Sequence, residues 1–185
     1  MIVIAVFGAS DSGKTTTIEY LVSRISKEGY KVGTIKHIHH ENFSIDTPGT
    51  DTWRHAQAGA AVVAAVSPKE TTIIKKTDTP LNDLDQILKL FDKENLDLIF
   101  IEGLHTLCAK RRDIFKIITA KDPEELVRNL KGTEPPILAV TGLVAKKKAE
   151  IEEIKIPIID LNSEGDSLLK LVKNKLAEER PNRSD

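Results

Sequence analysis

The chain has 185 residues, with 27 lysines and arginines against 28 aspartates and glutamates. The length predicts one domain over residues 1–178, with a full hydrophobic core, and a disordered tail over residues 179–185. The balanced charge gives no reason to expect nucleic acid or a membrane as a partner, and no apolar run approaches the ~20 residues of a membrane span. Cys108 is the single cysteine, which excludes an internal disulfide and favours a reducing, cytoplasmic location.

The first predicted element is a buried strand over residues 2–7, an apolar run rich in β-branched residues. The chain opens directly on this strand, so we expect no signal peptide before it. The strand leads into GASDSGKT, residues 8–15, which fits the phosphate-binding motif G-x-x-x-x-G-K-[ST] at every fixed position. Apolar residues at helical spacing then predict a helix over residues 18–25. Because the motif has the required strand before it and helix after it, we expect this chain to bind a nucleoside triphosphate.

The residue type at each fixed position of this motif has a physical role toward phosphates. Gly8 and Gly13 tolerate the dihedrals of a tight loop whose backbone N–H groups surround phosphate oxygens. The helix that follows adds its positive N-terminal dipole. We therefore expect Lys14 to reach the terminal phosphates and the Thr15 hydroxyl to bind Mg²⁺.

The rest of the chain alternates between predicted strands and helices. Strands are predicted over residues 31–36, 60–67, 71–76, 96–101, 114–119, 137–140 and 156–161. The second and third of these form an antiparallel pair, since only Pro68-Lys69-Glu70 separates them. Helices are predicted to start at Thr50 or Asp51, at Thr79, at the capping box that begins with Asp122, at Lys146, and before the apolar stripe over residues 168–176. This alternation predicts a three-layer α/β fold with a mostly parallel sheet.

The strand over residues 96–101 ends in an acidic residue. The segment DLIFIEG, residues 97–103, has the form of a Walker B strand with Glu102 as the terminal acid. Ligands collect at the carboxyl ends of strands in open parallel sheets. A carboxylate there holds Mg²⁺ through water or orients the water that attacks the γ-phosphate. We predict Lys14 and Glu102 as the catalytic residues of hydrolysis, the alternative for Glu102 being a solvent-facing acid at a strand end.

A polar segment over residues 36–55 is dense in His, Asp and Arg and lies where a switch loop would follow the second strand. Asp46 is the natural second Mg²⁺ ligand of this segment. Lys36, Arg54 and the histidines are candidates to contact phosphate or a second anionic ligand. Alternatively, the histidines at positions 37, 39 and 40 form a transition-metal site, although their spacing matches no standard zinc motif.

A helix starting near Asp51 places Asp51, Arg54 and His55 on one face. The other predicted residues already account for nucleotide and Mg²⁺ binding, so these three side chains are not needed for it. We therefore predict that this face engages the second ligand or a partner protein. Two further segments leave alternatives open. The guanine signature N-K-x-D is absent, so motif chemistry does not choose between guanine and adenine. The basic segment over residues 108–112 is an exposed loop or a site for an anionic partner ligand.

Four segments together carry a family resemblance: GASDSGKTT, GTIKH, DTPGTDTWRHAQAGA and LIFIEG. They resemble the molybdopterin-guanine dinucleotide biosynthesis protein B (MobB) family from the N-terminus to about Gly103. The resemblance implies a homodimeric GTP-binding P-loop protein with weak GTPase activity. It also implies an adaptor role beside the guanylyltransferase that attaches GMP to molybdopterin, in molybdenum cofactor maturation.

The resemblance also implies site residues. The nucleotide would be held by Gly8, Ser10, Asp11, Ser12, Gly13, Lys14, Thr15 and Thr16, with Arg54 as a further contact. The Mg²⁺ ligands would be Thr15, Asp46 and Glu102. Two other functions stay open on the same fold. A small-molecule kinase would need an acceptor pocket and usually an Arg-rich lid, and no such lid segment is evident. A metallochaperone GTPase rests on the histidine cluster alone.

Overall fold

The structure, a computed structural model, describes residues 1–40, 43–77, 81–151 and 154–179. The chain forms two compact units. The first comprises Met1–His37 and Asp83–Asp185, and the second comprises Ile38–Asn82. The prediction of one domain over residues 1–178 stays a prediction. No helix in the described part of the chain is long and apolar enough to cross a membrane.

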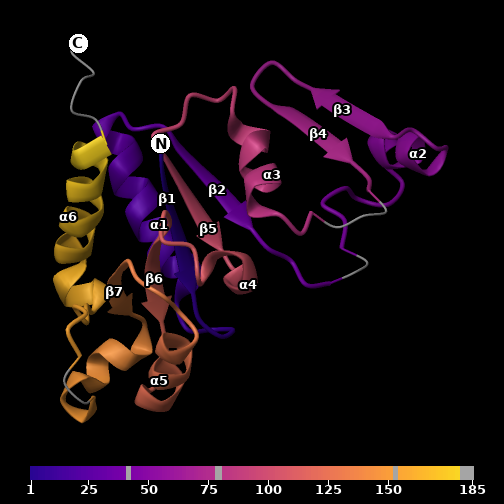
Figure 1. The fold of residues 1–185 in the computed structure, drawn as a ribbon. Coiled ribbons are helices and arrows are strands. Elements are labelled where there is room, and N and C mark those ends of the chain that lie inside the picture. The colour runs from indigo at the N-terminus through magenta and orange to yellow at the C-terminus, as the bar shows by residue number, and fades with distance from the viewer. Residues whose placement is uncertain (41–42, 78–80, 152–153, 180–185) are drawn as a thin grey trace. The chain divides into compact units, whose positions relative to one another are not determined.

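The first unit is built on a five-stranded sheet in which all neighbouring strands are parallel, in the order β2-β5-β1-β6-β7 (Figure 1). The strands are β1 (Ile2–Phe7), β2 (Val32–Lys36), β5 (Leu98–Glu102), β6 (Phe115–Thr119) and β7 (Ile137–Thr141). Every residue of β1 and β5 is buried. Two-sided burial is typical of a central parallel strand and explains why these two strands read as continuous apolar runs.

Helices cover both faces of this sheet. They are α1 (Lys14–Ile25), α3 (Leu84–Leu88), α4 (His105–Cys108), α5 (Pro123–Lys131) and α6 (Leu161–Glu179), with short 3₁₀ segments η1 (Ser26–Glu28), η2 (Lys89–Phe91) and η3 (Leu143–Glu150). Alternate side chains of β1 point to opposite faces. Ile4 joins the core cluster of α1 and α6, whereas Ala5 joins that of α3 and α4. The three-layer α/β prediction, with a P-loop-type mostly parallel sheet, is confirmed.

The second unit contains one helix and one hairpin. Helix α2 (Asp51–Gln57) begins after Thr50, whose side chain accepts a hydrogen bond from the Trp53 amide, as expected of an N-cap. Strands β3 (Val62–Val66) and β4 (Thr71–Lys75) pair antiparallel. The predicted helix start and the predicted antiparallel pair are both confirmed.

Two predictions about the C-terminal part were wrong. The predicted strand over residues 156–161 reduces to a single parallel bridge between Val140 and Ile158. Pro157 has no N–H for a ladder, and α6 already starts at Leu161. The charged helix predicted from Lys146 is instead the 3₁₀ segment η3, which starts at Leu143 and is kinked at Lys147. Glu179, predicted in the tail, is the last residue of α6, and residues 180–185 lie outside the described residues.

Helix α3 also begins later than predicted. Its N-cap is Asp83, whose carboxylate accepts from the Asp85 amide at 2.9 Å. Leu81 and Asn82 are not helical, and the predicted N-cap and N1 residues, Thr79 and Pro80, lie outside the described residues. The stripe of apolar residues is as predicted, since Leu84 and Ile87 are both buried.

Candidate functional site

The phosphate-binding motif forms the loop between β1 and α1, with the geometry that the sequence predicted. Gly13 is the N-cap of α1 and has a φ of 101°, a left-handed conformation that glycine adopts without strain. Gly8 lies so close to Thr119 of β6 that a Cβ at this position would overlap the Thr119 side chain and carbonyl. The loop therefore needs glycine at both positions for different reasons, backbone conformation at one and close packing at the other.

A cavity of about 460 Å³ lies over this loop and is lined mostly by polar groups. It is lined by Ser10, Asp11, Gly13, Lys14, Thr15, Thr16, Lys36 and Glu102. All predicted site residues of the first unit therefore line it except Gly8 and Ser12. Ser12 is fully buried beneath it, and its hydroxyl lies 2.6 Å from that of Thr119. The structure thus gathers the predicted loop and the predicted Walker B acid around one cavity.

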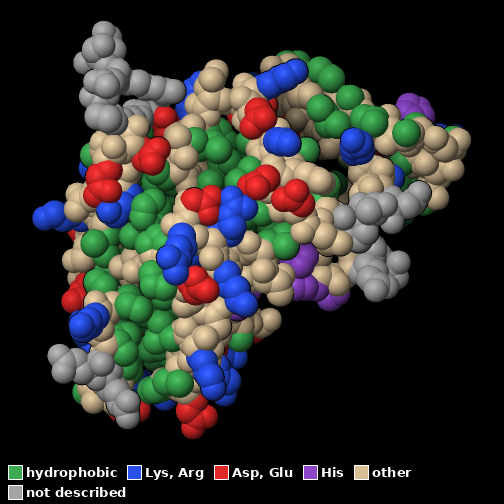
Figure 2. All heavy atoms as spheres, viewed as in Figure 1, with side chains coloured by type: hydrophobic (Ala, Val, Ile, Leu, Met, Phe, Trp, Pro, Cys, Tyr) green, Lys and Arg blue, Asp and Glu red, His purple; other side chains and the backbone are tan. Residues whose placement is uncertain are grey.

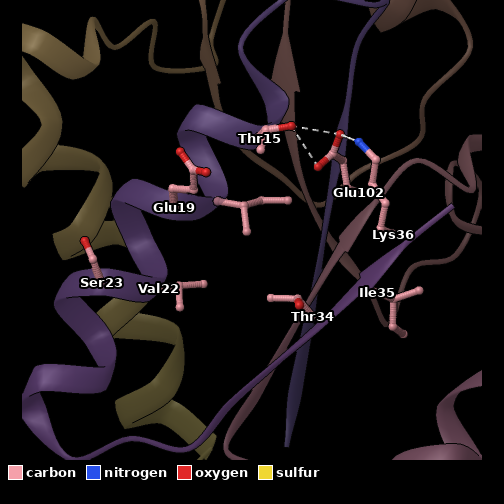
Figure 3. A pocket seen from close by; sticks show the side chains of 9 residues that line it. Thr15, Glu19, Val22, Ser23, Thr34, Ile35, Lys36 and Glu102 are labelled. Atoms are coloured by element: carbon pink, nitrogen blue, oxygen red, sulfur yellow. Dashed lines mark hydrogen bonds and ion pairs between the residues drawn. The ribbon is translucent and has the colours of Figure 1, made fainter. Parts of the chain in front are cut away.

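Glu102 is the charged centre of this cavity. Its carboxylate accepts hydrogen bonds from the Thr15 hydroxyl at 3.1 and 3.0 Å, and it forms an ion pair with Lys36 (Figure 3). Lys36 and Glu102 are register partners at the carboxyl ends of β2 and β5, so the sheet itself brings them together. The Glu102 side chain is almost completely buried, whereas Lys36 is half-exposed. Hydroxyl and carboxylate oxygens placed side by side are the ligand types that Mg²⁺ prefers.

Lys14 lies over the loop that precedes it. Its Nζ donates to the Ala9 carbonyl at 2.6 Å. Partial burial lowers the pKa of Lys14, and the nearby Glu102 carboxylate opposes that shift. The ammonium therefore faces the cavity and the loop backbone, and no part of the hydrophobic core depends on it.

Two buried side chains hold the loop from outside the motif, and sequence reasoning missed both. Thr119 Oγ1 donates to the Phe7 carbonyl at 2.9 Å, next to its contact with Ser12. Glu125 of α5 is 3 % exposed, and its carboxylate accepts from the Ala9 amide at 2.9 Å and from the Lys121 amide at 3.0 Å. The loop backbone is thus fixed by β6 and α5.

The predicted capping box of α5 is half realised. Asp122 accepts from the Glu125 amide at 2.8 Å, as predicted. The Glu125 carboxylate does not return to the Asp122 amide but bonds the residue before it and the phosphate-binding loop. The pattern of residues 122–125 was visible in the sequence, but the use of its second acid in the loop depends on a contact 116 residues away.

A second, mostly apolar cavity of about 450 Å³ adjoins the first, with Thr15, Lys36 and Glu102 common to both. Its other lining residues come from α1 and β2 (Figure 3); they are Ile18, Glu19, Val22, Ser23, Thr34 and Ile35. A ligand there would contact apolar side chains on one side and the Glu102–Lys36 pair on the other.

The remaining predicted residues belong to the second unit. Asp46 Oδ1 accepts from the Thr47 amide at 2.9 Å and from the hydroxyls of Thr50 and Thr52 at 2.9 and 3.0 Å. Its Oδ2 is buried and has no hydrogen-bond partner among the described residues. Arg54 is exposed and pairs with Asp51 at 3.7 Å along α2. This pair agrees with the predicted common face, whereas the roles of Asp46 toward Mg²⁺ and of Arg54 toward phosphate stay predictions.

The last two predicted features are the metal site at the histidines and the basic segment over residues 108–112. Within the ranges that the structure describes, no group of three His, Cys, Asp or Glu side chains is arranged to hold a metal ion, so a metal site at the histidines stays a hypothesis. In the basic segment, Arg111 bonds Asp113 and Asp85, and Arg112 pairs with Glu134 at 3.6 Å. The exposed-loop alternative is wrong for Cys108 and Ala109, which are buried at the end of α4, and it agrees only with the basic residues 110–112.

A glycine-bounded loop between a central parallel strand and a helix, with an acid at the end of the neighbouring strand, defines the class of P-loop NTPase folds. Within that class, the chain belongs to the MobB family, whose family model, described as molybdopterin guanine dinucleotide synthesis protein B, matches residues 3–140.

Relatives of known name agree with this assignment. A molybdopterin-guanine dinucleotide biosynthesis adapter protein of Haemophilus influenzae is 32 % identical over 137 residues, which are 74 % of this chain and 72 % of the relative. The adapter protein of Escherichia coli is 35 % identical over 134 residues, 69 % of this chain and 73 % of the relative. The crystal structure of Bacillus subtilis MobB superposes with a TM-score of 0.72 at 24 % identity, covering 95 % of this chain and 98 % of that chain. This last likeness supports the fold alone.

Proposed function

We propose that this protein is a GTP-binding adapter in the biosynthesis of molybdopterin guanine dinucleotide, acting in the cytoplasm with slow GTP hydrolysis. The adapter role rests on family membership and on the names of the relatives. The observation that supports nucleotide binding is the cavity that Lys14, Thr15 and Glu102 line together. Backbone N–H groups of the loop and the Lys14 ammonium offer positive charge to a triphosphate.

The same cavity has groups that fit Mg²⁺. Thr15 and Glu102 already lie within hydrogen-bond distance of each other, so one cation can reach both oxygens. The family resemblance implies Asp46, in the second unit, as a further ligand; within that unit its Oδ2 is buried and accepts no hydrogen bond from any described residue. When bound, Mg²⁺ supplies neutralising charge to the phosphates. Glu102, which Thr15 and Lys36 both engage, is the group that we assign to Mg²⁺ or to the attacking water, and the slow rate rests on the family resemblance.

The second unit supplies the surface that we assign to partners. The face of α2 with Asp51, Arg54 and His55 is the candidate contact for molybdopterin or for the guanylyltransferase, since the Arg54 guanidinium suits an anionic group. The β3–β4 hairpin exposes Val62, Val66 and Ile73. We assign this hairpin to the homodimer that the family resemblance implies, because a two-stranded hairpin alone is marginally stable in water.

The test of nucleotide binding uses Lys14→Ala with Lys170→Ala as the matched control, an exposed lysine on α6. Calorimetric titration with GTP and Mg²⁺ should show binding to the wild-type and control proteins and a loss of at least ~100-fold in affinity for Lys14→Ala, since a charge-assisted contact to phosphate is removed. Thermal unfolding should be unchanged because Lys14 packs against no core residue. Equal affinity in all three proteins would overturn nucleotide binding at this loop.

The test of the adapter role uses Arg54→Ala. GTP affinity should stay within about threefold of wild type, less than the loss of one good hydrogen bond. Formation of guanylated cofactor in a reconstituted assay with the transferase should fall. The matched control is Arg128→Ala, an exposed arginine on α5 of the first unit, which should leave cofactor formation unchanged. A loss of GTP affinity as large as that of Lys14→Ala would assign Arg54 to the nucleotide site instead.

The apolar cavity between α1 and β2 keeps a second function open, because it adjoins Glu102 where a phosphoryl acceptor could lie. A small-molecule kinase would transfer phosphate from labelled nucleotide to an added acceptor, whereas a GTPase releases free phosphate. Incubation with labelled GTP, Mg²⁺ and candidate acceptors separates the two. Labelled free phosphate as the sole product supports the proposed function.

A further inference from the structure

A third cavity, of about 250 Å³, lies on the other side of the phosphate-binding loop. Asp11, Gly13 and Thr16 line both this cavity and the 460 Å³ cavity, so one molecule held at the loop can extend across Thr16 into it. The far wall comes from the end of β7, the first residues of η3 and the start of α6. Sites for whole drug-sized ligands measure about 300–1,000 Å³, so this volume suits a single heterocycle better than an entire nucleotide.

The far wall offers one carboxylate and several weaker polar groups. Asp160 caps α6, with its Oδ1 accepting from the Asn162 amide at 3.0 Å and its carbonyl accepting from the Glu164 amide at 2.7 Å. Among the described residues, Asp160 Oδ2 accepts no hydrogen bond, so it is available to a ligand. Thr141, at the end of β7, also lines the cavity and is fully buried, and its hydroxyl has no partner within the described ranges.

Both positive and negative charges lie around the cavity. The N-terminus of the 19-residue α6 points its positive dipole end here, and the exposed Lys146 adds a cation. Among the described residues of the far wall, Asp160 is the single carboxylate. A ligand that fits must therefore present hydrogen-bond donors to Asp160 and an electron-rich oxygen elsewhere, on a flat ring system that packs beside Leu143 and Leu161.

We propose that this cavity binds the base of the nucleotide and that Asp160 selects guanine, an inference that rests on the proposed nucleotide binding at the loop. Guanine presents N1–H and N2–H₂ donors side by side, with O6 as an acceptor. The carboxylate accepts from both donors. Adenine has a lone pair at N1 in place of the donor, which the carboxylate repels. The chain thus has an acid for guanine at the start of α6, although the N-K-x-D signature is absent from its sequence.

The test compares GTP, ATP, XTP and inorganic tripolyphosphate on the full chain, by calorimetry with Mg²⁺. Wild type should bind GTP at least ~tenfold more tightly than ATP, as expected for a hydrogen bond to a charged group. Asp160→Asn should lose at least ~tenfold in GTP affinity and gain in XTP affinity, because the amide can donate to the C2 oxygen of xanthine. Tripolyphosphate, which has no base, should bind both proteins equally.

The stability of the variant and a matched control separate base recognition from a structural effect of the substitution. Asn caps helices as well as Asp, so the substitution should leave the melting temperature unchanged. Asp166→Asn, the same substitution on the same helix outside the cavity, is the matched control and should bind like wild type. Tripolyphosphate binding with equal affinities for GTP and ATP, or an unchanged preference in Asp160→Asn, would overturn the base assignment alone. If the wild-type protein does not bind tripolyphosphate, both the phosphate site and the base assignment are overturned.

Discussion

At the scale of single residues, neighbouring side chains hold the Glu102 carboxylate in a defined position in the phosphate cavity. It is nearly buried, yet it is not an uncompensated charge, because Thr15 and Lys36 both bond it. Removal of one partner from such a buried pair leaves the other charge without compensation. The Glu102 carboxylate therefore links α1, the helix after the phosphate-binding loop, to the carboxyl end of β5.

Glu102→Gln tests its assignment to metal or water. The amide keeps an oxygen for the Thr15 hydroxyl but loses the charge that Mg²⁺ or an attacking water needs. GTP hydrolysis should slow by about 100-fold, the lower range for loss of a positioned acid or base, while GTP affinity changes by less than about tenfold. Single-turnover phosphate release and calorimetry measure the two quantities. Glu19→Gln, in the adjoining cavity, is the control, and equal losses of rate and affinity would indicate a structural role for Glu102.

At the scale of elements, α5 stabilises the phosphate-binding loop as well as its own first turn. The buried Glu125 carboxylate satisfies one amide of the loop and one amide before the helix, and Asp122 satisfies a third. A buried amide without an acceptor costs about 1–3 kcal/mol, so these bonds define the loop backbone. In the described part of the chain, the Glu125 side chain makes no hydrogen bond to a residue that lines the phosphate cavity, so we expect it to act on a ligand by positioning the loop backbone.

Glu125→Gln should expose that role. The glutamine oxygen can replace one carboxylate oxygen but not both, so either the Ala9 or the Lys121 amide loses its acceptor, at a cost of about 1–3 kcal/mol in unfolding free energy. Urea unfolding measures this cost, and GTP affinity should fall with it. Glu124→Gln, the neighbouring exposed acid, should change neither. Wild-type stability of Glu125→Gln would show that the loop holds its conformation without α5.

At the scale of the whole molecule, the second unit carries an apolar surface that its own residues leave exposed. Hydrophobic side chains gather over the β3–β4 hairpin in Figure 2, where Val62, Val66 and Ile73 are 53 %, 76 % and 68 % exposed. Pairing of Ala64 with Ile73 puts these residues on a common face of the hairpin. Exposed apolar patches on soluble proteins mark interaction sites, which agrees with the proposed homodimer.

Val66→Glu should weaken that dimer. A charge buried against an apolar partner surface is costly, so the dimer dissociation constant should rise at least ~tenfold. Analytical ultracentrifugation over a concentration series measures it. Leu90→Glu, at a leucine of the first unit that is 66 % exposed, is the control for a general effect of added charge. A monomeric wild-type protein, or an unchanged dimer in Val66→Glu, would reject the hairpin as the interface.

Local patterns were enough to predict several parts of this protein. Some patterns involve only residues that are close in sequence: the apolar run of β1, the glycines and lysine of the loop, and the apolar spacing of α1. They could therefore be predicted without a structure. The same is true of the Thr50 cap and of the β3–β4 pair. The acid at the end of β5 was also predicted, because a buried parallel strand must deliver its last residue to the carboxyl edge of the sheet.

Only the tertiary structure decided how distant residues meet. Strand order set Lys36 beside Glu102, and the packing of α5 brought Glu125 to Ala9 across 116 positions. Asp160 lies within the strand that the sequence predicts, but in the structure it caps α6 and lines one cavity with residues of the phosphate-binding loop. These contacts join segments that share no periodicity or short spacing. Their free energy comes from burial and hydrogen bonds formed only after the sheet has closed around β1, so no local pattern could encode them.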